Sequence, residues 1–160
     1  CKEGKIIDTV ILGKALSLIK KYINLEKSYF WIVYPRNKNI NNLHLQVAGI
    51  WDPYQLNKVD NTNFEKDPNE LLEELNLNDN YFSIRGELVY VNTQKKEVVI
   101  KICSSPTSKR LKNPTFKIVV EGEIALKFLN NFVSLDVIRD GNILRIVKHE
   151  IIEKIKSAKS

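Results

Sequence analysis

Apolar and polar residues alternate with a period of two along much of the second half of the chain. The alternation is clearest over Glu97–Cys103 and Thr115–Glu121, where β-branched residues occupy one side of each run. This pattern predicts strands that bury one face. Three further runs carry the same signal, so this half is predicted to hold five strands, the others being Tyr81–Val91, Phe132–Arg139 and Asn142–Lys148.

The segments that connect these runs carry turn and helix signals. Gly86 interrupts the first strand, at a point where a barrel strand can bulge and turn a corner. A turn is expected over Asn92–Lys95, and a short helix over Glu123–Asn131. Asp140-Gly141 predicts a tight hairpin turn that needs positive φ. The chain is then expected to finish in a helix after the fifth strand, over Glu150–Ala158.

The first half mixes helical and strand patterns. Apolar residues recur at steps of three or four over Lys5–Ile23, which predicts an amphipathic helix, with a strand over Thr9–Leu12 as the alternative. Lys27–Tyr34 and Leu43–Trp51 predict two strands that pair as a hairpin with a long loop. Pro35 is expected to end the first of these strands.

A second helix is predicted after an irregular segment, Asp52–Phe64. Asp67 can cap the free amides of a helix over Pro68–Leu75, and proline suits the first helical position. We therefore expect four parts, which are an N-terminal helix and β-hairpin extension (1–66), a capped-helix linker (67–79), a barrel (80–149) and a C-terminal helix or tail (150–160).

Positive charge is concentrated in one stretch. Lys95–Lys117 holds seven basic residues and one acid, a net charge of +6 that equals the formal net charge of the whole chain. It surrounds a loop, Ser104–Pro114, between two predicted strands. This arrangement favours an anionic partner such as nucleic acid. A lysine-rich surface without a specific partner is the alternative.

The order of the elements from Asn80 to Lys148 resembles the OB-fold, a five-stranded Greek-key barrel with a helix between its third and fourth strands. We therefore expect a mainly β (α+β) protein. The resemblance implies single-stranded nucleic acid, with RNA favoured, bound on the barrel face and the basic loop. The candidate nucleic-acid-binding residues are Arg85, Lys95, Lys96, Lys101, Lys109, Arg110, Lys112, Lys117, Arg139, Arg145 and Tyr81.

Tyr81 is chosen as the stacking ring because it lies near a strand end. Tyr90 shares a face with Leu88 and is expected to be at least half buried. Phe116 alternates in phase with Ile118 and Val120 and is expected to lie in the core. A face with few free rings favours backbone contact without base selectivity.

The sequence pattern FSIRGELV…LDVIRDGNIL is similar to that of uncharacterised conserved proteins of cyanobacteria and plastids. This similarity implies no particular activity. This similarity implies a location in the cytoplasm or in the plastid stroma. The chain lacks methionine and opens on Cys1, which is expected of a processed or truncated product. No apolar run has the length of a membrane span.

The sequence does not favour catalysis, and neither a metal nor a cofactor is expected. It contains no phosphate-binding glycine loop, no cluster of metal ligands and no nucleophile elbow. Cys103 and His149 are candidate nucleophile and base, but an idle thiol is the preferred interpretation because no acid is placed to orient the histidine. The alternative to nucleic-acid binding is a structural or assembly subunit that docks on a protein partner in a larger complex.

Overall fold

The computed structural model describes residues 6–24, 29–51, 80–103 and 115–154, together with residues 4, 26, 70 and 73. The chain divides into two compact units. One comprises residues 1–34 and 44–79, and the other comprises residues 35–43 and 80–160. The short segment 35–43 therefore belongs with the second half of the chain, although it lies in the first half of the sequence.

The described part of the first unit is built on a three-stranded sheet with strand order β1-β3-β2. Strand β1 (Thr9–Ile11) pairs in parallel with β3 (Leu43–Trp51), and helix α1 spans Gly13–Tyr22. The helix predicted from Lys5 is therefore wrong in its first half, where the alternative strand forms. Thr9, Val10 and Ile11 are β-branched and fit a pleated sheet better than a helix.

Strand β2 (Phe30–Asn37) continues through Pro35, so the prediction that Pro35 ends the strand is wrong. Proline cannot donate a hydrogen bond to a neighbouring strand, and it is tolerated on edge strands. β2 lies at the edge of its sheet, beside β3 alone. The predicted hairpin of β2 and β3 is confirmed.

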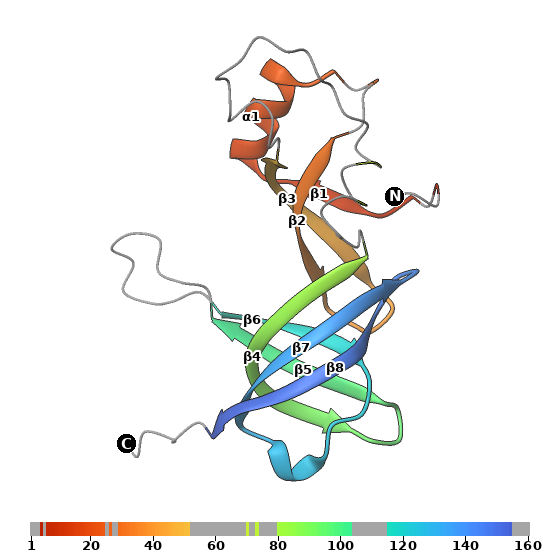
Figure 1. Cartoon of the computed structure of the whole chain (residues 1–160), viewed down its shortest axis with the longest axis vertical. Helices are drawn as coiled ribbons and strands as arrows, with labels where there is room; N and C mark the ends of the chain where they lie inside the picture. The colour runs from red at the N-terminus through yellow and green to blue at the C-terminus, as the bar shows by residue number, and fades with distance from the viewer. Residues whose placement is uncertain are drawn as a thin grey trace, which may run out of the picture. The chain divides into compact units, whose positions relative to one another are not determined.

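Five strands form the second unit. They are β4 (Tyr81–Asn92), β5 (Glu97–Cys103), β6 (Thr115–Glu121), β7 (Asn131–Asp140) and β8 (Ile143–Lys154). Their spatial order is β4-β5-β6-β8-β7, and β4 also pairs with β7, so the strands close on themselves (Figure 1). The predicted mainly β class is confirmed.

The barrel core follows the alternation read from the sequence. One side of every strand is buried, and the aliphatic residues on these sides form a single cluster. Its fully enclosed members come from all five strands, and they are Leu88, Val98, Ile100, Ile118, Val120, Val133, Leu135, Val137 and Leu144.

Strand β4 pairs with two neighbouring strands, each along a different part of its length. Tyr81–Glu87 pairs with β7, and Glu87–Asn92 pairs with β5. Gly86 lies where the strand passes from one partner to the other, and a Cβ atom there would overlap the carbonyl oxygen of Lys101. The register shift lies further on, between Leu88 and Tyr90, and not at the glycine.

Two predicted helices are corrected by the structure. The helix expected over Glu123–Asn131 is a single 3-10 turn, η1 (Leu126–Phe128). The helix expected over Glu150–Ala158 is wrong as far as the structure describes it, because β8 extends to Lys154. Ile151 pairs with Val133 and packs against the core, so burial of its side chain favours the strand.

The turn between β7 and β8 lies one residue later than predicted. Asp140 pairs with Ile143, which leaves Gly141 and Asn142 as the turn residues. Gly141 has φ of 59°, as the predicted turn requires of its glycine.

Several predictions fall outside the described residues. These are the irregular segment Asp52–Phe64 and the basic loop Ser104–Pro114. Of the helix predicted over Pro68–Leu75, only Glu70 and Glu73 are described, and both are helical. Within the described ranges, no helix has the length and apolar character needed to cross a membrane.

Candidate nucleic-acid interface

The outer face of β4, β5 and β6 carries two parallel rows of side chains. In the first row, Val99 of β5 pairs with Tyr90 on one side and with Val119 on the other. All three point away from the barrel core, since their neighbours Val98 and Val120 are fully buried. The row is therefore an apolar strip across three strands with an aromatic ring at its β4 end.

The second row is charged. Lys101 of β5 pairs with Glu87 of β4 and with Lys117 of β6. The ammonium group of Lys101 lies 3.3 Å from the Glu87 carboxylate. Two lysines directly opposite each other on neighbouring strands repel, and one carboxylate offsets only part of this cost. The row therefore retains a net positive charge that an anion would neutralise.

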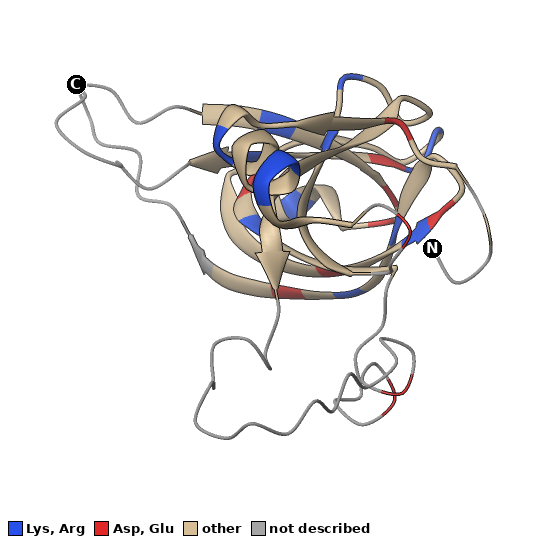
Figure 2. Cartoon of the chain, turned by 90° about the horizontal axis from the view of Figure 1, so that it is seen from above, with Lys and Arg blue, Asp and Glu red and all other residues tan. Residues whose placement is uncertain are grey.

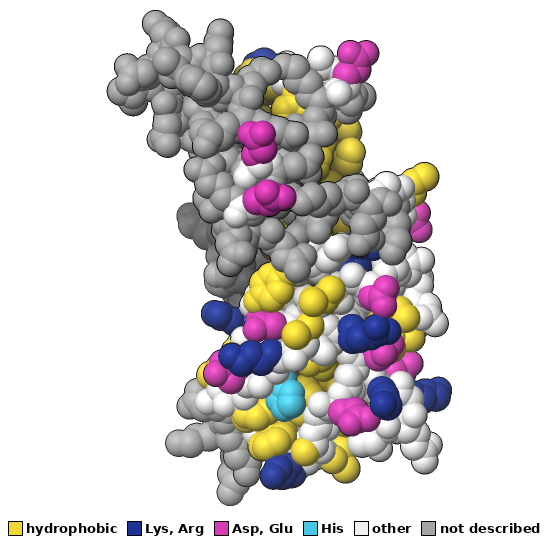
Figure 3. Space-filling model, turned by 45° about the vertical axis from the view of Figure 1, so that its right-hand side comes forward, with side chains coloured by type: hydrophobic (Ala, Val, Ile, Leu, Met, Phe, Trp, Pro, Cys, Tyr) yellow, Lys and Arg dark blue, Asp and Glu magenta, His cyan; other side chains and the backbone are white. Residues whose placement is uncertain are grey.

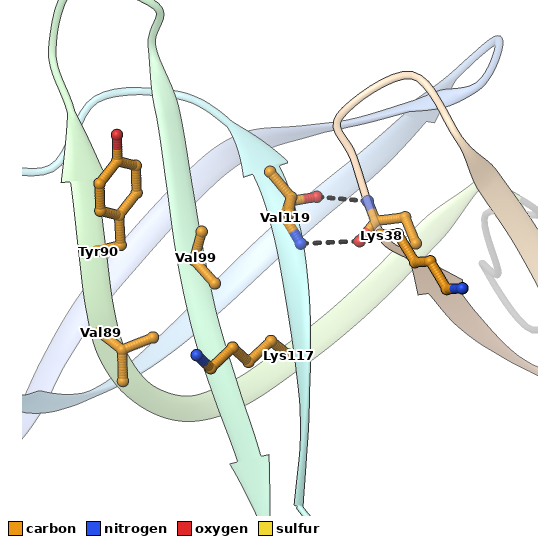
Figure 4. Close-up of a pocket in the computed structure, with 7 residues that line it drawn as sticks. Lys38, Val89, Tyr90, Val99, Lys117 and Val119 are labelled. Carbon is orange, nitrogen blue, oxygen red and sulfur yellow. Dashed lines mark hydrogen bonds between the residues drawn. The ribbon is translucent and has the colours of Figure 1, made fainter.

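A hollow of about 570 Å³ lies over the apolar row and reaches Lys117 of the charged row. Two of the residues that line the hollow belong to the hairpin segment Pro35–Leu43, and the others belong to the outer face. The lining residues are Asn37, Lys38, Val89, Tyr90, Val99, Lys117 and Val119. Figure 4 shows the Lys117 ammonium directed back over β5 towards β4, whereas the Lys38 ammonium points away from the sheet face. Clefts for small ligands have volumes of about 300–1,000 Å³, so the hollow has room for a nucleotide.

Tyr90 was not among the predicted site residues, because regular alternation places it on the face of Leu88. The register shift makes Val89 an extra residue in β4, so Tyr90 turns to the outer face while Leu88 stays in the core. The ring is 47% exposed. Asn92 donates a hydrogen bond from Nδ2 to the Tyr90 hydroxyl at 3.2 Å, which restrains the ring.

Tyr81, the predicted stacking ring, lies at the other end of β4. It is exposed as predicted, but its hydroxyl donates a hydrogen bond to Asp136 Oδ1 at 2.6 Å. This contact with a carboxylate raises the pKa of Tyr81 above its usual value, with a smaller contribution from desolvation. An acidic neighbour repels phosphate, so the surroundings of Tyr81 do not favour RNA.

The predicted cations do not form one cluster. Arg85 is exposed on β4 opposite Ser134 of β7, outside the hollow. Lys95 and Lys96 are exposed in the turn between β4 and β5. Lys96 forms an ion pair of 3.2 Å with Glu123. Figure 2 shows acidic positions interspersed among basic ones along the barrel strands, and Figure 3 shows both kinds of side chain together on one face.

Arg139, one of the predicted RNA contacts, is buried at the end of the barrel. Arg139 is 5% exposed, and its guanidinium donates to the Gly141 carbonyl at 2.9 Å and to Asn80 Oδ1 at 2.8 Å. It fastens the end of the β7–β8 hairpin. Arg145 is exposed but is held between Glu121 and Asp140, at 3.1 and 2.9 Å.

The Phe116 ring and the cations of the basic loop are the remaining candidates. The guanidinium of Arg36 covers the Phe116 ring at 3.7 Å from its centroid, so that face of the ring is not open to a base. Lys109, Arg110 and Lys112 lie outside the described residues, in the segment that connects β5 to β6. Of the predicted cations, the structure therefore brings Lys101 and Lys117 together on one face.

Comparison with protein families identifies both halves of the chain. Residues 1–58 match the family described as the PatR RNA-binding protein, N-terminal OB-fold domain. Residues 84–153 match the cyanobacterial OB-fold-like RNA-binding domain, C-terminal, of the same proteins. The chain is therefore similar to both families, each over less than half of its length. Comparisons with curated proteins and with solved structures find no match.

These matches confirm the OB-fold resemblance and the link to cyanobacteria, and both matched families are described as RNA-binding. They also refine the architecture. Residues 1–58, which the sequence predicts as part of an extension to one barrel, match an OB-fold domain of their own. Among the described residues, no group of three or more His, Cys, Asp or Glu side chains is placed to hold a metal ion.

Proposed function

We propose that the barrel binds single-stranded RNA on the outer face of β4, β5 and β6, and that it does so without catalysis. Single strands bind where aromatic rings stack on bases and cations follow phosphates. The observation that carries the proposal is the adjacency of the two rows. The Tyr90 ring ends an apolar row, and Lys101 and Lys117 lie in the row beside it.

The apolar row gives this face little means to read a base sequence. Val89, Val99 and Val119 have no hydrogen-bonding side-chain groups, and bases are distinguished through hydrogen bonds to their edges. Stacking tolerates every base because every base has a π face. We therefore expect similar affinities for single-stranded RNAs of different sequence.

The basic loop begins and ends at strands of the same face. It connects Cys103 of β5 to Thr115 of β6, and these two residues pair with each other at the edge of the face. We propose that Lys109, Arg110 and Lys112 contact further phosphates. Charge reversal at all three should weaken binding to every RNA sequence. Unchanged affinity in that variant would remove the loop from the proposal.

The direct test is fluorescence anisotropy with labelled single-stranded RNA, single-stranded DNA and duplex DNA over a salt series. We expect single-stranded RNA to bind, with log affinity falling by about 0.7 per phosphate contacted for each tenfold rise in salt. The Tyr90→Ala variant should lose affinity, whereas Tyr81→Ala, a tyrosine of the same strand with almost the same exposure, should not. Loss in Tyr81→Ala alone would place the site on the other side of β4.

A second role, as an assembly subunit with a protein partner, is favoured by the first unit. Its helix and strands expose large apolar side chains, and such surfaces often mark protein contacts. The partly exposed residues include Val10, Ile11, Leu12, Leu16, Leu18, Tyr22, Trp31, Ile32 and Tyr34. Co-purification of a large complex by a chain that does not bind isolated RNA would support this role over the first.

The cyanobacterial cytoplasm is the proposed location, and plastid import stays a prediction.

A further inference from the structure

The hairpin segment Pro35–Leu43 is fastened to strand β6 by the side chain of Asn37. Nδ2 of Asn37 donates to the Val119 carbonyl at 2.6 Å, and the Val119 amide donates to Asn37 Oδ1 at 2.8 Å. Asn37 is only 7% exposed. The asparagine amide thus serves the peptide group of Val119 as a neighbouring strand would. The two dashed lines in Figure 4 end on this peptide group.

The fold explains why this peptide group takes a side chain as its partner. Val119 pairs with Val99 of β5 on one side. On the other side of β6, the described residues of β8 pair with it at Glu121, opposite Arg145, and not at Val119. Without Asn37, the edge of β6 at Val119 would leave an amide and a carbonyl with no partner in a neighbouring strand, which is costly where water does not replace it. Asn37 removes that cost, so its position is strongly favoured.

A second contact extends the attachment along β6. The guanidinium of Arg36 stacks on the ring of Phe116, three residues before Val119. The segment therefore contacts β6 at two points, one on each side of the position of Lys117. Because Asn37 and Lys38 also line the hollow, the segment forms its wall on the β6 side.

This wall closes the rows at one end only. A strand of RNA that enters over Tyr90 and follows the rows across β5 meets the hairpin segment after Val119 and Lys117. It cannot continue in that direction over the sheet. At the other end of the apolar row, Tyr90 is half exposed. An OB-fold face open at both ends would instead let a strand pass across it.

We infer that the hollow takes the terminal nucleotide of a single-stranded RNA, with its base on Tyr90 and its phosphate at Lys117. This inference rests on the proposed function, since it specifies which part of the RNA the same face binds. Asn37 is a positioning residue here. It holds the wall against β6 and leaves the contacts with RNA to other side chains.

The test compares a linear RNA with a circular RNA of the same sequence. A length of about 20 nucleotides exceeds the usual site of about 4–16 nucleotides for one OB fold, so both can follow the face. We expect the linear RNA to bind about tenfold more tightly, as the loss of one stacked base and its phosphate contact predicts. Linear RNAs that carry a phosphate on the 5′ or the 3′ end then identify which end enters the hollow.

Three variants separate this inference from the proposed function. Asn37→Ala should reduce the preference for linear RNA while Asn39→Ala, on the exposed part of the same hairpin, keeps it. Asn37→Asp keeps an acceptor for the Val119 amide and provides a second test should the alanine variant unfold. Amide hydrogen exchange at Val119 should accelerate in Asn37→Ala if the wall has detached.

The outcomes are distinct. Equal affinity for linear and circular RNA, with both lowered by Tyr90→Ala, would overturn terminal binding and leave the proposed function intact. If Tyr90→Ala leaves the affinity for both RNAs unchanged, the proposed function itself is overturned. A full preference for linear RNA in a folded Asn37→Ala protein with fast exchange at Val119 would overturn the role of the wall.

Discussion

The two ends of strand β4 each present an exposed tyrosine, yet their surroundings differ. Tyr81 is 46% exposed and Tyr90 47%. Tyr81 donates a hydrogen bond to the Asp136 carboxylate, whereas Tyr90 borders a hollow that Lys117 also lines. Exposure of a ring is therefore not enough to identify a stacking platform. The sign of the charge next to the ring decides whether a phosphate backbone can approach it.

The difference arises from what each end of the strand pairs with. The Tyr81 end pairs with β7, which brings Asp136 beside it. The Tyr90 end pairs with β5, which connects through Val99 to β6. One strand thus contributes to two faces, and only one of them has the net positive charge that RNA binding needs.

The largest expected effect comes from reversing the charge of the basic row. Lys101→Glu with Lys117→Glu should weaken binding of single-stranded RNA at least about 100-fold, because like charges at a contact cost several kcal/mol. The matched control is Arg85→Glu with Lys148→Glu, which changes the net charge equally but alters exposed residues of β4 and β8 outside the hollow. Anisotropy at one salt concentration measures both.

Equal losses in these two double variants would contradict the assignment of the face. That result would mean that the total charge of the barrel, and not its position, governs binding.

The next effect separates the two tyrosines. Tyr90→Ala should lower affinity by about 5- to 150-fold, the equivalent of about 1–3 kcal/mol for one stacked base. Tyr81→Ala should change it less than about twofold, since surface changes away from a contact are within about 0.5 kcal/mol. Tyr90→Phe should bind almost normally because the ring provides the stacking. A large loss in Tyr90→Phe would show that the hydroxyl, and not the ring face, makes the contact.

A third prediction concerns Gly86, where the two ends of β4 meet. Gly86→Ala places a methyl group against the Lys101 carbonyl and should lower the free energy of unfolding by about 1–3 kcal/mol or more. Urea denaturation measures this change. Gly13→Ala is the control, because nothing lies within 4 Å of the position of its Cβ and alanine favours a helix. Equal stability of Gly86→Ala and the parent chain would contradict the close approach of β4 to β5.

The strands of the binding face could be predicted from the sequence, but the direction of Tyr90 and the role of Asn37 could not. The alternation over β5 and β6 gave both strands with their bounds, because each buries one face without interruption. The same alternation failed at Tyr90, since one extra residue in β4 reverses the direction of the side chains that follow. Asn37 was missed because its partner, Val119, is remote in the sequence.

The smallest effect is local to Tyr81. The pKa of Tyr81 is raised above 10.0 by its hydrogen bond to Asp136, so the phenol stays protonated to higher pH in the folded chain. The contribution of this contact to stability is present below the ordinary pKa and is lost as pH rises through the raised one. In Asp136→Ala, the pKa of Tyr81 should fall, as followed by NMR of its ring, while RNA affinity stays constant. A pKa that does not move would contradict the assigned cause.

The most direct test of the central claim is photo-crosslinking with single-stranded RNA that carries iodouracil, followed by mass spectrometry of the crosslinked peptides. Iodouracil reacts with the aromatic ring on which it stacks. We expect the crosslink to fall on Tyr90 and to disappear in Tyr90→Ala. A crosslink on Tyr81, or elsewhere on β7 and β8, with none on Tyr90 would contradict the central claim.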